Sequence, residues 1–213
     1  MSRGRPRSFD RDEALEQALL LFWARGYEGT TLAALQEAMG GITAPSFYAA
    51  FRSKEQLFRE IVELYGKVQA APMVKALTEN TSARDSIEGM LRAALVVWQQ
   101  RDRPRGCLVS LAAVNCMPEN RNIEEYLRAQ RALRHKAIRQ RLERGVAEGD
   151  LPRTASLAGI ATFYSTMLDG LALQARDGAS RKALGAVVDS AMAAWKDLAG
   201  TKFGQRKVAR SST

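Results

Sequence analysis

The chain has 213 residues, of which 46% are hydrophobic and 26% are charged, and its formal net charge at pH 7 is +9. This balance is typical of a globular protein with a core of its own and excludes a largely disordered chain. No stretch approaches the roughly 18–20 apolar residues of a membrane span. No signal peptide is visible either, so we expect a cytoplasmic protein.

Enzymatic chemistry has little support in the sequence. The two cysteines, Cys107 and Cys116, make neither a disulfide framework nor a metal-binding spacing, so we expect free thiols. The only histidine, His135, falls in a basic segment, and there is no Ser-His-Asp set and no phosphate-binding loop. We therefore expect no catalytic residue, no metal and no cofactor.

The positive charge is unevenly distributed along the chain. Residues 1–60 carry eight basic and eight acidic side chains, residues 101–153 carry twelve and seven, and residues 201–213 carry four and none. Net charge is therefore a weak guide to a DNA-binding surface. Within the first block, Arg3, Arg5 and Arg7 precede every acidic residue and form a local basic arm.

The first part of the chain reads as four helices. Apolar residues at helical spacing, with capping and turn residues between them, predict helices over residues 10–25, 31–40 and 44–51. Ser53 and Gln56 predict the start of a fourth helix, and Pro72 predicts its end or a kink.

The second part reads as longer helices. Apolar stripes predict helices over 87–98, 121–148, 157–171 and 184–198, and a short helix over 107–117 that Pro118 ends. The polar, basic residues 201–213 are expected to be disordered. Nothing alternates at a period of two residues, so the predicted fold class is all-α with about nine helices.

The stretch "GITAPSFYAAFRSKEQLF", residues 41–58, contains a helix of barely two turns followed at once by another helix start. A helix, a glycine turn and a short second helix make a helix-turn-helix pattern, in which the second helix enters the DNA major groove. Pro45 fits the first turn, whose N–H groups lack intrahelical partners. Three ordinary packed helices would give the same pattern.

Residues 3–65 resemble the N-terminal domain of the TetR family of bacterial transcriptional regulators. The resemblance is carried by the "GRPR" arm, "LFWARGYEGTTL" and "SFYAAFRSKEQLF", while the doubled glycine Gly40-Gly41 departs from the usual turn. It implies a dimeric DNA-binding regulator, most simply a repressor released from a pseudo-palindromic operator by a small apolar or reactive ligand. The implied parts are a basic arm (1–8), a helix-turn-helix domain (9–52), a connecting helix (53–71), a ligand-binding and dimerisation domain (72–200) and a basic tail (201–213).

The resemblance also implies which residues contact DNA. Tyr48 and Lys54 stand where the family contacts phosphate, and Thr31 can donate similarly or serve only as a helix cap. The base-reading candidates lack Arg, Lys, Asn and Gln, so bidentate major-groove readout is not expected. They are Thr43, Ala44, Pro45, Ser46 and Ala49. Arg3, Arg5 or Arg7 is expected to reach an adjacent minor groove.

The resemblance implies a dimer interface on the last two long helices and a ligand pocket within the C-terminal domain, among the helices between residues 87 and 171. Small residues near their apolar faces permit close packing, and the interface candidates are Leu168, Leu171, Val187, Ala191 and Trp195. Aromatic and polarizable side chains suit an adaptable pocket, although for any single residue a place in the plain core is the simpler interpretation. The pocket candidates are Met90, Trp98, Cys107, Leu111, Met117, Tyr126, Phe163, Tyr164 and Met167.

Two alternatives stay open. Cys107, in "RPRGCLVSL", opens a predicted helix with Arg103 and Arg105 upstream, which would favour a reactive thiolate and a redox or electrophile sensor, whereas a buried cysteine would be inert. The chain could instead be a helical interaction protein or a nonspecific DNA binder that uses the basic helix over 121–148 and the tail, or this helix could simply have a solvated face. Its basic residues are Arg128, Arg131, Arg134, Lys136, Arg139, Arg141 and Arg144.

Overall fold

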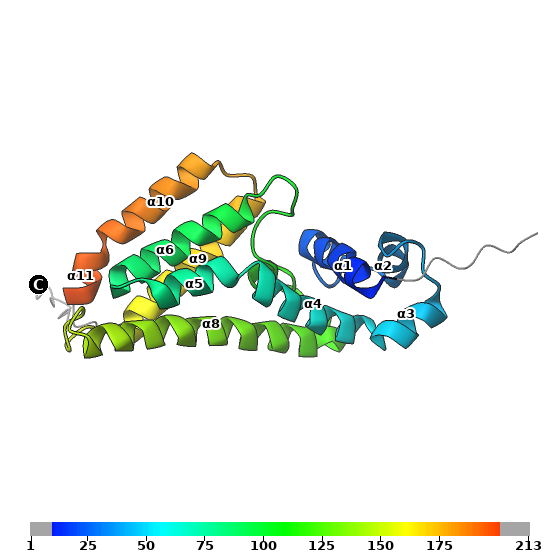
Figure 1. Ribbon diagram of the computed structural model, residues 1–213, viewed down its shortest axis with the longest axis horizontal. Helices are drawn as coiled ribbons and strands as arrows, with labels where there is room; N and C mark the ends of the chain where they lie inside the picture. The colour runs from blue at the N-terminus through cyan, green and yellow to red at the C-terminus, as the bar shows by residue number, and fades with distance from the viewer. Residues whose placement is uncertain (1–9, 201–213) are drawn as a thin grey trace, which may run out of the picture.

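The computed structural model describes residues 10–200, and all regular secondary structure in this range is helical. The molecule is elongated, with α1, α2 and α3 at one end and a larger bundle along the long helix α8 (Figure 1). The helices are α1 (Arg11–Arg25), α2 (Leu32–Ala38), α3 (Ala44–Phe51), α4 (Lys54–Val68), α5 (Ala71–Glu79), α6 (Ala83–Trp98), α7 (Leu108–Leu111), the 3-10 helix η1 (Pro118–Asn120), α8 (Arg121–Ala147), α9 (Leu157–Arg176), α10 (Arg181–Ala193) and α11 (Trp195–Gly200).

Side-chain caps set the starts of the first four helices. The carboxylate of Asp10 accepts hydrogen bonds from the backbone N–H groups of the first turn of α1, and Thr31, Thr43 and Ser53 do the same for α2, α3 and α4. Between α2 and α3, Gly40 and Gly41 have φ of +84° and +76°, in the left-handed region that glycine adopts without strain. The doubled glycine thus forms the turn of the predicted helix-turn-helix.

One continuous hydrophobic core runs through both ends of the molecule. At the joint, the ring of Trp23 meets that of Tyr65 edge-on at 5.0 Å, and Phe22 meets Phe58 in the same way. In the larger part, α5 packs on α6 and α8 packs on α9, while α10 contacts α6 and α9. The α4 helix therefore belongs to both parts, because its side chains contribute to the core of each.

The predicted all-helical fold is confirmed, and the structure differs from the expected helices in three details. Pro72 does not end a helix: it stands in the first turn of α5, where no backbone N–H is needed. The expected helix over 107–117 is only α7, because the carbonyl of Ala112 accepts instead from the N–H of Tyr27 at 2.8 Å. The last predicted helix is divided at Ala194 into α10 and α11.

Candidate DNA interface and ligand cavity

Helix α3 exposes a short row of small and polar side chains beside its buried aromatic face. Phe47 and Phe51 are fully buried, as expected from the apolar pattern. Pro45, Ser46, Tyr48 and Ala49 are exposed, whereas Ala44 is half-buried. Helix α3 therefore has one buried face and one exposed face, and it is short enough that its first turns are accessible. This is the geometry of a helix that enters the major groove of DNA.

The two threonines predicted to contact DNA both cap helices. The Thr31 hydroxyl accepts from the N–H of Ala34 at 3.1 Å, and Thr43 accepts from the N–H of Ser46 at 3.4 Å. The Thr43 and Ser46 hydroxyls also lie 3.0 Å apart. Both threonines are exposed, so capping leaves the hydroxyls open to an additional partner.

Lys54 begins α4, as predicted, but its ammonium lies against the protein. The Nζ atom is 4.2 Å from the centroid of the Tyr27 ring, a cation–π contact. Burial lowers the pKa of Lys54, and the neighbouring Glu28 offsets part of this effect. Lys54 is therefore held against Tyr27, and its contact with a DNA phosphate stays a prediction. Arg3, Arg5 and Arg7 lie outside the described residues.

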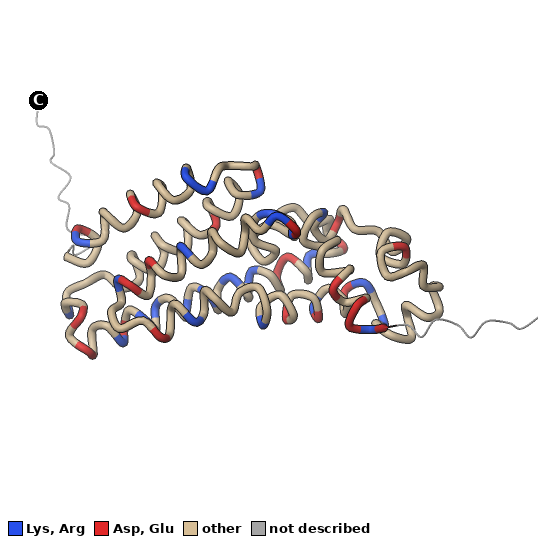
Figure 2. Tube along the Cα trace, turned by 45° about the horizontal axis from the view of Figure 1, so that its top comes forward, with Lys and Arg blue, Asp and Glu red and all other residues tan. Residues whose placement is uncertain are grey.

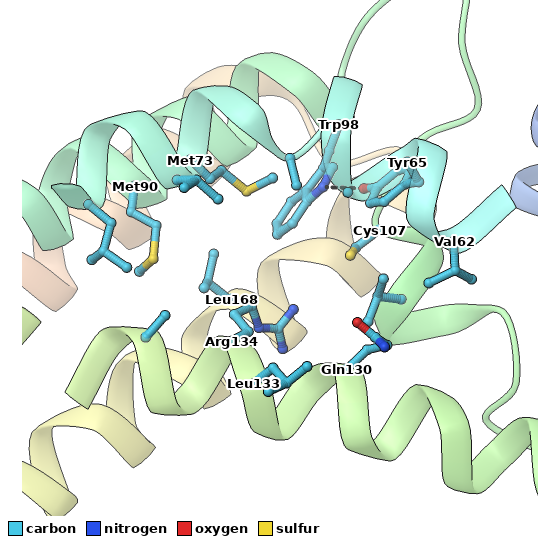
Figure 3. Close-up of a pocket in the computed structure, with 16 residues that line it drawn as sticks. Val62, Tyr65, Met73, Met90, Trp98, Cys107, Gln130, Leu133, Arg134 and Leu168 are labelled. Atoms are coloured by element: carbon cyan, nitrogen blue, oxygen red, sulfur yellow. Dashed lines mark hydrogen bonds between the residues drawn. The ribbon is translucent and has the colours of Figure 1, made fainter. Parts of the chain in front are cut away.

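A mostly apolar cavity of about 290 Å³ lies between α4, α5, α6, α8 and α9. Met73, Met90 and Trp98 form one wall, and α8 forms the opposite wall with Gln130, Leu133 and Arg134 (Figure 3). Tyr65 and Cys107 close the end nearest the DNA-binding part.

Hydrogen bonds fix the polar groups at the closed end of the cavity. The indole Nε1 of Trp98 donates to the Tyr65 hydroxyl at 3.3 Å. Burial, together with the neighbouring Cys107 thiol, raises the pKa of Tyr65 well above its ordinary value, so the phenol stays neutral. This end therefore presents ring faces, a neutral phenol and the sulfur of Cys107.

The cavity includes three of the nine predicted pocket residues, Met90, Trp98 and Cys107. The other six, which do not line it, are Leu111, Met117, Tyr126, Phe163, Tyr164 and Met167. Met117 is exposed, Tyr126 lies beneath the guanidinium of Arg59, and Tyr164 is buried in the core. The sequence reading missed the cavity residues of α4, α5 and α8. The apolar stripe of α4 was visible, but no local signal marked the inward-facing Gln130 and Arg134.

A shallow groove lies on the outer face of α9 and α10. Two residues predicted for the ligand pocket and two predicted for the dimer interface line it. Phe163 and Met167, predicted for the pocket, lie there beside Val187 and Ala191, predicted for the dimer interface. The other interface candidates are buried within the protomer: Leu168 lines the cavity, Leu171 is in the core, and Trp195 packs near Tyr164.

One segment connects the cavity to the DNA-binding part, and we call residues 106–120 the linking segment. At its start, Gly106 accepts a hydrogen bond from Nε1 of Trp23 at 2.9 Å, and Cys107 lines the cavity. At its end, the carboxylate of Glu28 accepts from the N–H of Met117 and from the amide of Asn120, each at 2.9 Å. Burial alone would raise the pKa of Glu28, but these bonds and the charge of Lys54 lower it below its ordinary value.

Cys107 is buried and Cys116 is half-buried, and both are free thiols. Of the arginines expected to activate Cys107, Arg103 is paired with Glu16 at 2.8 Å, and Arg105 lies near Gly178. Because α7 has only four residues, its dipole is also weak. Burial raises the pKa of Cys116, and the nearby Glu28 raises it further.

The arginines predicted to give α8 a basic surface are engaged within the protein. Arg128, Arg139 and Arg144 pair with glutamates one turn away, and Arg134 pairs with Asp169. Arg131 donates to the carbonyl of Val109, and Arg141 is buried against Ser86. Within residues 10–200, no helix is long and apolar enough to cross a membrane, and no group of three or more metal-ligating side chains is found.

Comparison with known proteins gives consistent matches. The family model "Bacterial regulatory proteins, tetR family" matches residues 14–61. The HTH-type transcriptional repressor ComR of Escherichia coli (strain K12) is 32% identical over 92% of this chain and 94% of its own length. The repressor BdcR of the same organism is 29% identical over 83% of this chain and 84% of its own.

A solved structure of a TetR-family regulator also matches this chain. It is a cysteine mutant of the TetR family transcriptional regulator CifR, complexed with 26-base-pair operator DNA. It superposes with a TM-score of 0.86 at 45% identity and covers 90% of this chain and all of its own. Because the similarity extends over nearly the whole chain, the protein belongs to the TetR family of bacterial regulatory proteins.

Proposed function

We propose that this TetR-family regulator is a homodimeric, cytoplasmic repressor that holds a pseudo-palindromic operator through α3 and leaves it when a small apolar molecule fills the cavity. Its relatives ComR and BdcR are transcriptional repressors, so the chain is a DNA-binding regulator and not an enzyme. The observation that carries the proposal is the exposed row on α3 in a chain that also encloses an apolar cavity.

In the proposed complex, the hydroxyls of Tyr48 and Thr31 contact phosphate, and the start of α3 faces base edges. Pro45 and Ala49 supply apolar contacts of the kind that favour a thymine methyl group, and Ser46 supplies a hydroxyl. Without a bidentate reader on α3, part of the specificity falls to DNA shape, read by the arginine arm in a minor groove.

This role of α3 is tested by adding a carboxylate to its exposed face. We expect Ala49→Glu to abolish binding to duplexes that the wild-type protein selects from a random pool, because the new charge faces phosphate and base edges. Ala132→Glu makes the same change at an exposed position on α8 and should bind normally. Fluorescence anisotropy at one moderate salt concentration measures both, and normal binding by Ala49→Glu would contradict the proposal.

Release by a ligand follows from the position of α4. Its residues Val62 and Tyr65 line the cavity, and only two residues separate its first residue, Lys54, from the end of α3. A molecule in the cavity that binds better when α4 shifts would favour dimers whose two α3 helices no longer match the operator spacing.

Covalent sensing through Cys107 is the second candidate, and it is favoured by one observation: this buried thiol lines the cavity. An electrophile small enough to enter would then reach the sulfur. Operator binding by the wild type and by Cys107→Ser, with and without N-ethylmaleimide, separates the two candidates. If the reagent leaves wild-type binding unchanged, Cys107 is structural and the inducer binds without a covalent bond.

A nonspecific basic DNA-binding protein is the remaining alternative. Because the arginines of α8 have partners within the protomer, their charge is less available to phosphate. Sequence dependence separates the classes: a regulator prefers one operator at a given salt concentration, whereas a nonspecific binder responds only to ionic strength.

A further inference from the structure

We infer that Arg52, together with the amide of Gln56, forms a binding site for a DNA phosphate at the edge of the groove that α3 enters. The inference rests on the proposed function, because it adds a contact to the reading of DNA by α3. It starts from a shallow polar depression that is lined by Ala49 of the exposed row, by Arg52 and Gln56, and by the Arg11–Glu60 pair.

Most basic side chains of the DNA-binding part are engaged within the protein. Among residues 10–61, only Arg25 and Arg52 are exposed without an ion pair, a side-chain hydrogen bond or an aromatic partner in the described range. Arg25 lies beside residues 101–104, so Arg52 is the free cation next to α3. The pairs that engage the other three basic residues are Arg11–Glu60, Lys54–Tyr27 and Arg59–Glu55.

A strained turn holds Arg52 at the end of α3. Its N–H still donates to the carbonyl of Tyr48 at 2.9 Å, as in a helix, but the N–H of Ser53 donates to the carbonyl of Phe51 at 2.7 Å. With φ of +63° and ψ of −49°, Arg52 is the central residue of a γ-turn with positive φ, a rare conformation that glycine adopts more easily. An arginine at a position that glycine fits better points to a use for its side chain.

The same turn leaves the amide of Gln56 without a partner. The Ser53 hydroxyl caps α4 by accepting from the N–H of Gln56 at 3.0 Å, and in a capping box the glutamine side chain would accept from the serine N–H in return. Here the Ser53 N–H donates to the carbonyl of Phe51 instead. The exposed Gln56 amide therefore makes no hydrogen bond within residues 10–200 and can donate to the oxygen that Arg52 binds.

The charges around the depression favour an anion. Of the described residues that line it, Glu60 alone carries a carboxylate, and Arg11 neutralises it at 2.5 Å. The charge of Arg52 is therefore not cancelled. The nearby start of α4 adds a partial positive charge, because the backbone dipoles of a helix point their positive ends to its N-terminus.

The length of α3 places this depression at the edge of a major groove. A helix of eight residues is about 12 Å long, whereas the groove is about 8.5 Å deep. When the first turn of α3 lies against base edges, its last residues therefore lie near the phosphates at the groove edge. Figure 1 shows α3 at the end of the molecule away from the larger bundle, where DNA can approach it.

The salt dependence of operator binding tests the inference, because each phosphate contact releases counterions. Fluorescence anisotropy follows the full-length protein on a duplex that it selects from a random pool, between about 50 and 200 mM KCl. Arg52→Gln removes the charge but keeps the strained turn, and both protomers of the dimer lose one contact. We expect the slope of log affinity against log salt to fall in magnitude by about two units. Affinity should weaken roughly tenfold, and equally for the selected duplex and a mutated one.

Further variants separate charge from structure. Arg52→Lys keeps the charge and should keep the salt dependence, whereas Arg52→Gly relieves the strain and should still lose the same slope as Arg52→Gln. Gln56→Ala should weaken binding at every salt concentration without changing the slope, since it removes a neutral donor. Arg25→Gln is the matched control, because it removes another exposed, unpaired charge of the same part of the chain. It should keep the wild-type slope.

The inference is overturned if Arg52→Gln keeps the wild-type slope, if Arg25→Gln lowers the slope as much, or if Arg52→Gly restores it. The first two outcomes leave the proposed function intact, because the wild type would still select and bind an operator. If the wild type selects no duplex at all, the proposed function fails and the inference fails with it.

Discussion

Gly106 lies close to three helices, α1, α6 and α9, and directly precedes the cavity residue Cys107. Its carbonyl accepts from the Trp23 indole on α1, and its N–H donates to the carbonyl of Trp98 on α6 at 3.3 Å. Its φ is +82°, and a Cβ atom at this position would lie 2.7 Å from the carbonyl oxygen of Ala172 on α9. Only glycine fits both constraints without displacing backbone.

The first prediction compares two glycines with the same backbone conformation. Gly149 also has φ of +82° but has no atom near its missing Cβ. We expect Gly149→Ala to lower the free energy of unfolding by about 1 kcal/mol through strain, and Gly106→Ala to lower it by about 3 kcal/mol through strain and the clash with Ala172. Urea unfolding at one fixed protein concentration measures both. Equal losses would show that the approach to α9 imposes no constraint.

The second prediction concerns Tyr164 at high pH. Burial raises its pKa to about 12, and its hydroxyl donates to the carbonyl of Ala191 at 3.0 Å. In the unfolded chain a tyrosine ionises near pH 10. Above about pH 10 the unfolded chain therefore loses a proton that the folded chain keeps, so the stability present below pH 10 falls as the pH rises toward 12.

Tyr164→Phe should lower the free energy of unfolding by about 1 kcal/mol at neutral pH, because the Ala191 carbonyl loses its partner. It should also reduce the fall in stability between about pH 9 and pH 11. Tyr48→Phe, which alters a half-exposed ring on α3, is the control and should change neither quantity. An unchanged fall in Tyr164→Phe would contradict the role given to burial.

At the scale of elements, the linking segment is held at both ends by hydrogen bonds to the DNA-binding part. The carbonyls of Gly106 and Ala112 accept hydrogen bonds from the N–H groups of Trp23 and Tyr27, respectively. The carboxylate of Glu28 accepts a hydrogen bond from the N–H of Met117. Because the same segment presents Cys107 to the cavity, a change in the cavity wall and a change at the end of α1 are mechanically connected.

The third prediction concerns the end of the linking segment that is bound to Glu28. Glu28→Ala removes the acceptor of two hydrogen bonds, so we expect a loss of about 1 kcal/mol in unfolding free energy and a several-fold weaker affinity for the operator. Anisotropy and thermal unfolding provide the two measurements. Glu119→Ala removes an exposed carboxylate in the same segment and should behave as the wild type. Equal operator affinity in both variants would show that the Glu28 bonds do not hold the DNA-binding part in place.

Local signals in the sequence predicted the helix starts well. Thr43 and Ser53 cap α3 and α4 through hydrogen bonds within three residues, so neighbouring residues in the sequence specify them. The length of α7 could not be predicted, because its end is set by Tyr27, far away in the chain.

The faces of α9 show why the cavity was only partly predictable. Phe163 and Met167 differ from Tyr164 and Leu168 by one position, hence by about 100° around the helix. All four are apolar, so periodicity alone cannot decide which pair faces the cavity and core and which faces the outer groove. In the structure Leu168 lines the cavity, whereas Phe163 and Met167 line the outer groove. The assignment depends on where α8 and α10 pack, which no local pattern specifies.

For the whole molecule, the distribution of charge matters more than its sum. Lys and Arg outnumber Glu along α8 (Figure 2), but most of its arginines are paired one turn away or across to α9. The net charge of +9 therefore does not mark a DNA-binding face. The outer groove of α9 and α10, in contrast, exposes apolar side chains that a second copy would cover.

The fourth prediction tests that groove as the dimer interface. Val187, 39% exposed on α10, lines it, so Val187→Arg should place a charge in the interface and give monomers that no longer hold the operator. Val96→Arg, at a position 48% exposed on α6 and outside the groove, should leave the dimer intact. Sedimentation velocity and anisotropy measure the two effects. A dimer that survives Val187→Arg would place the interface on other helices.

The central claim is that two copies of this chain read one operator through their two α3 helices. Selection of bound duplexes from a random DNA pool by the full-length protein, followed by sequencing, tests it most directly. We predict an inverted repeat whose half-site centres lie one or more helical turns apart, roughly 10 base pairs or a multiple of this. Recovery of a single half-site, or of no preferred sequence at all, would contradict the claim.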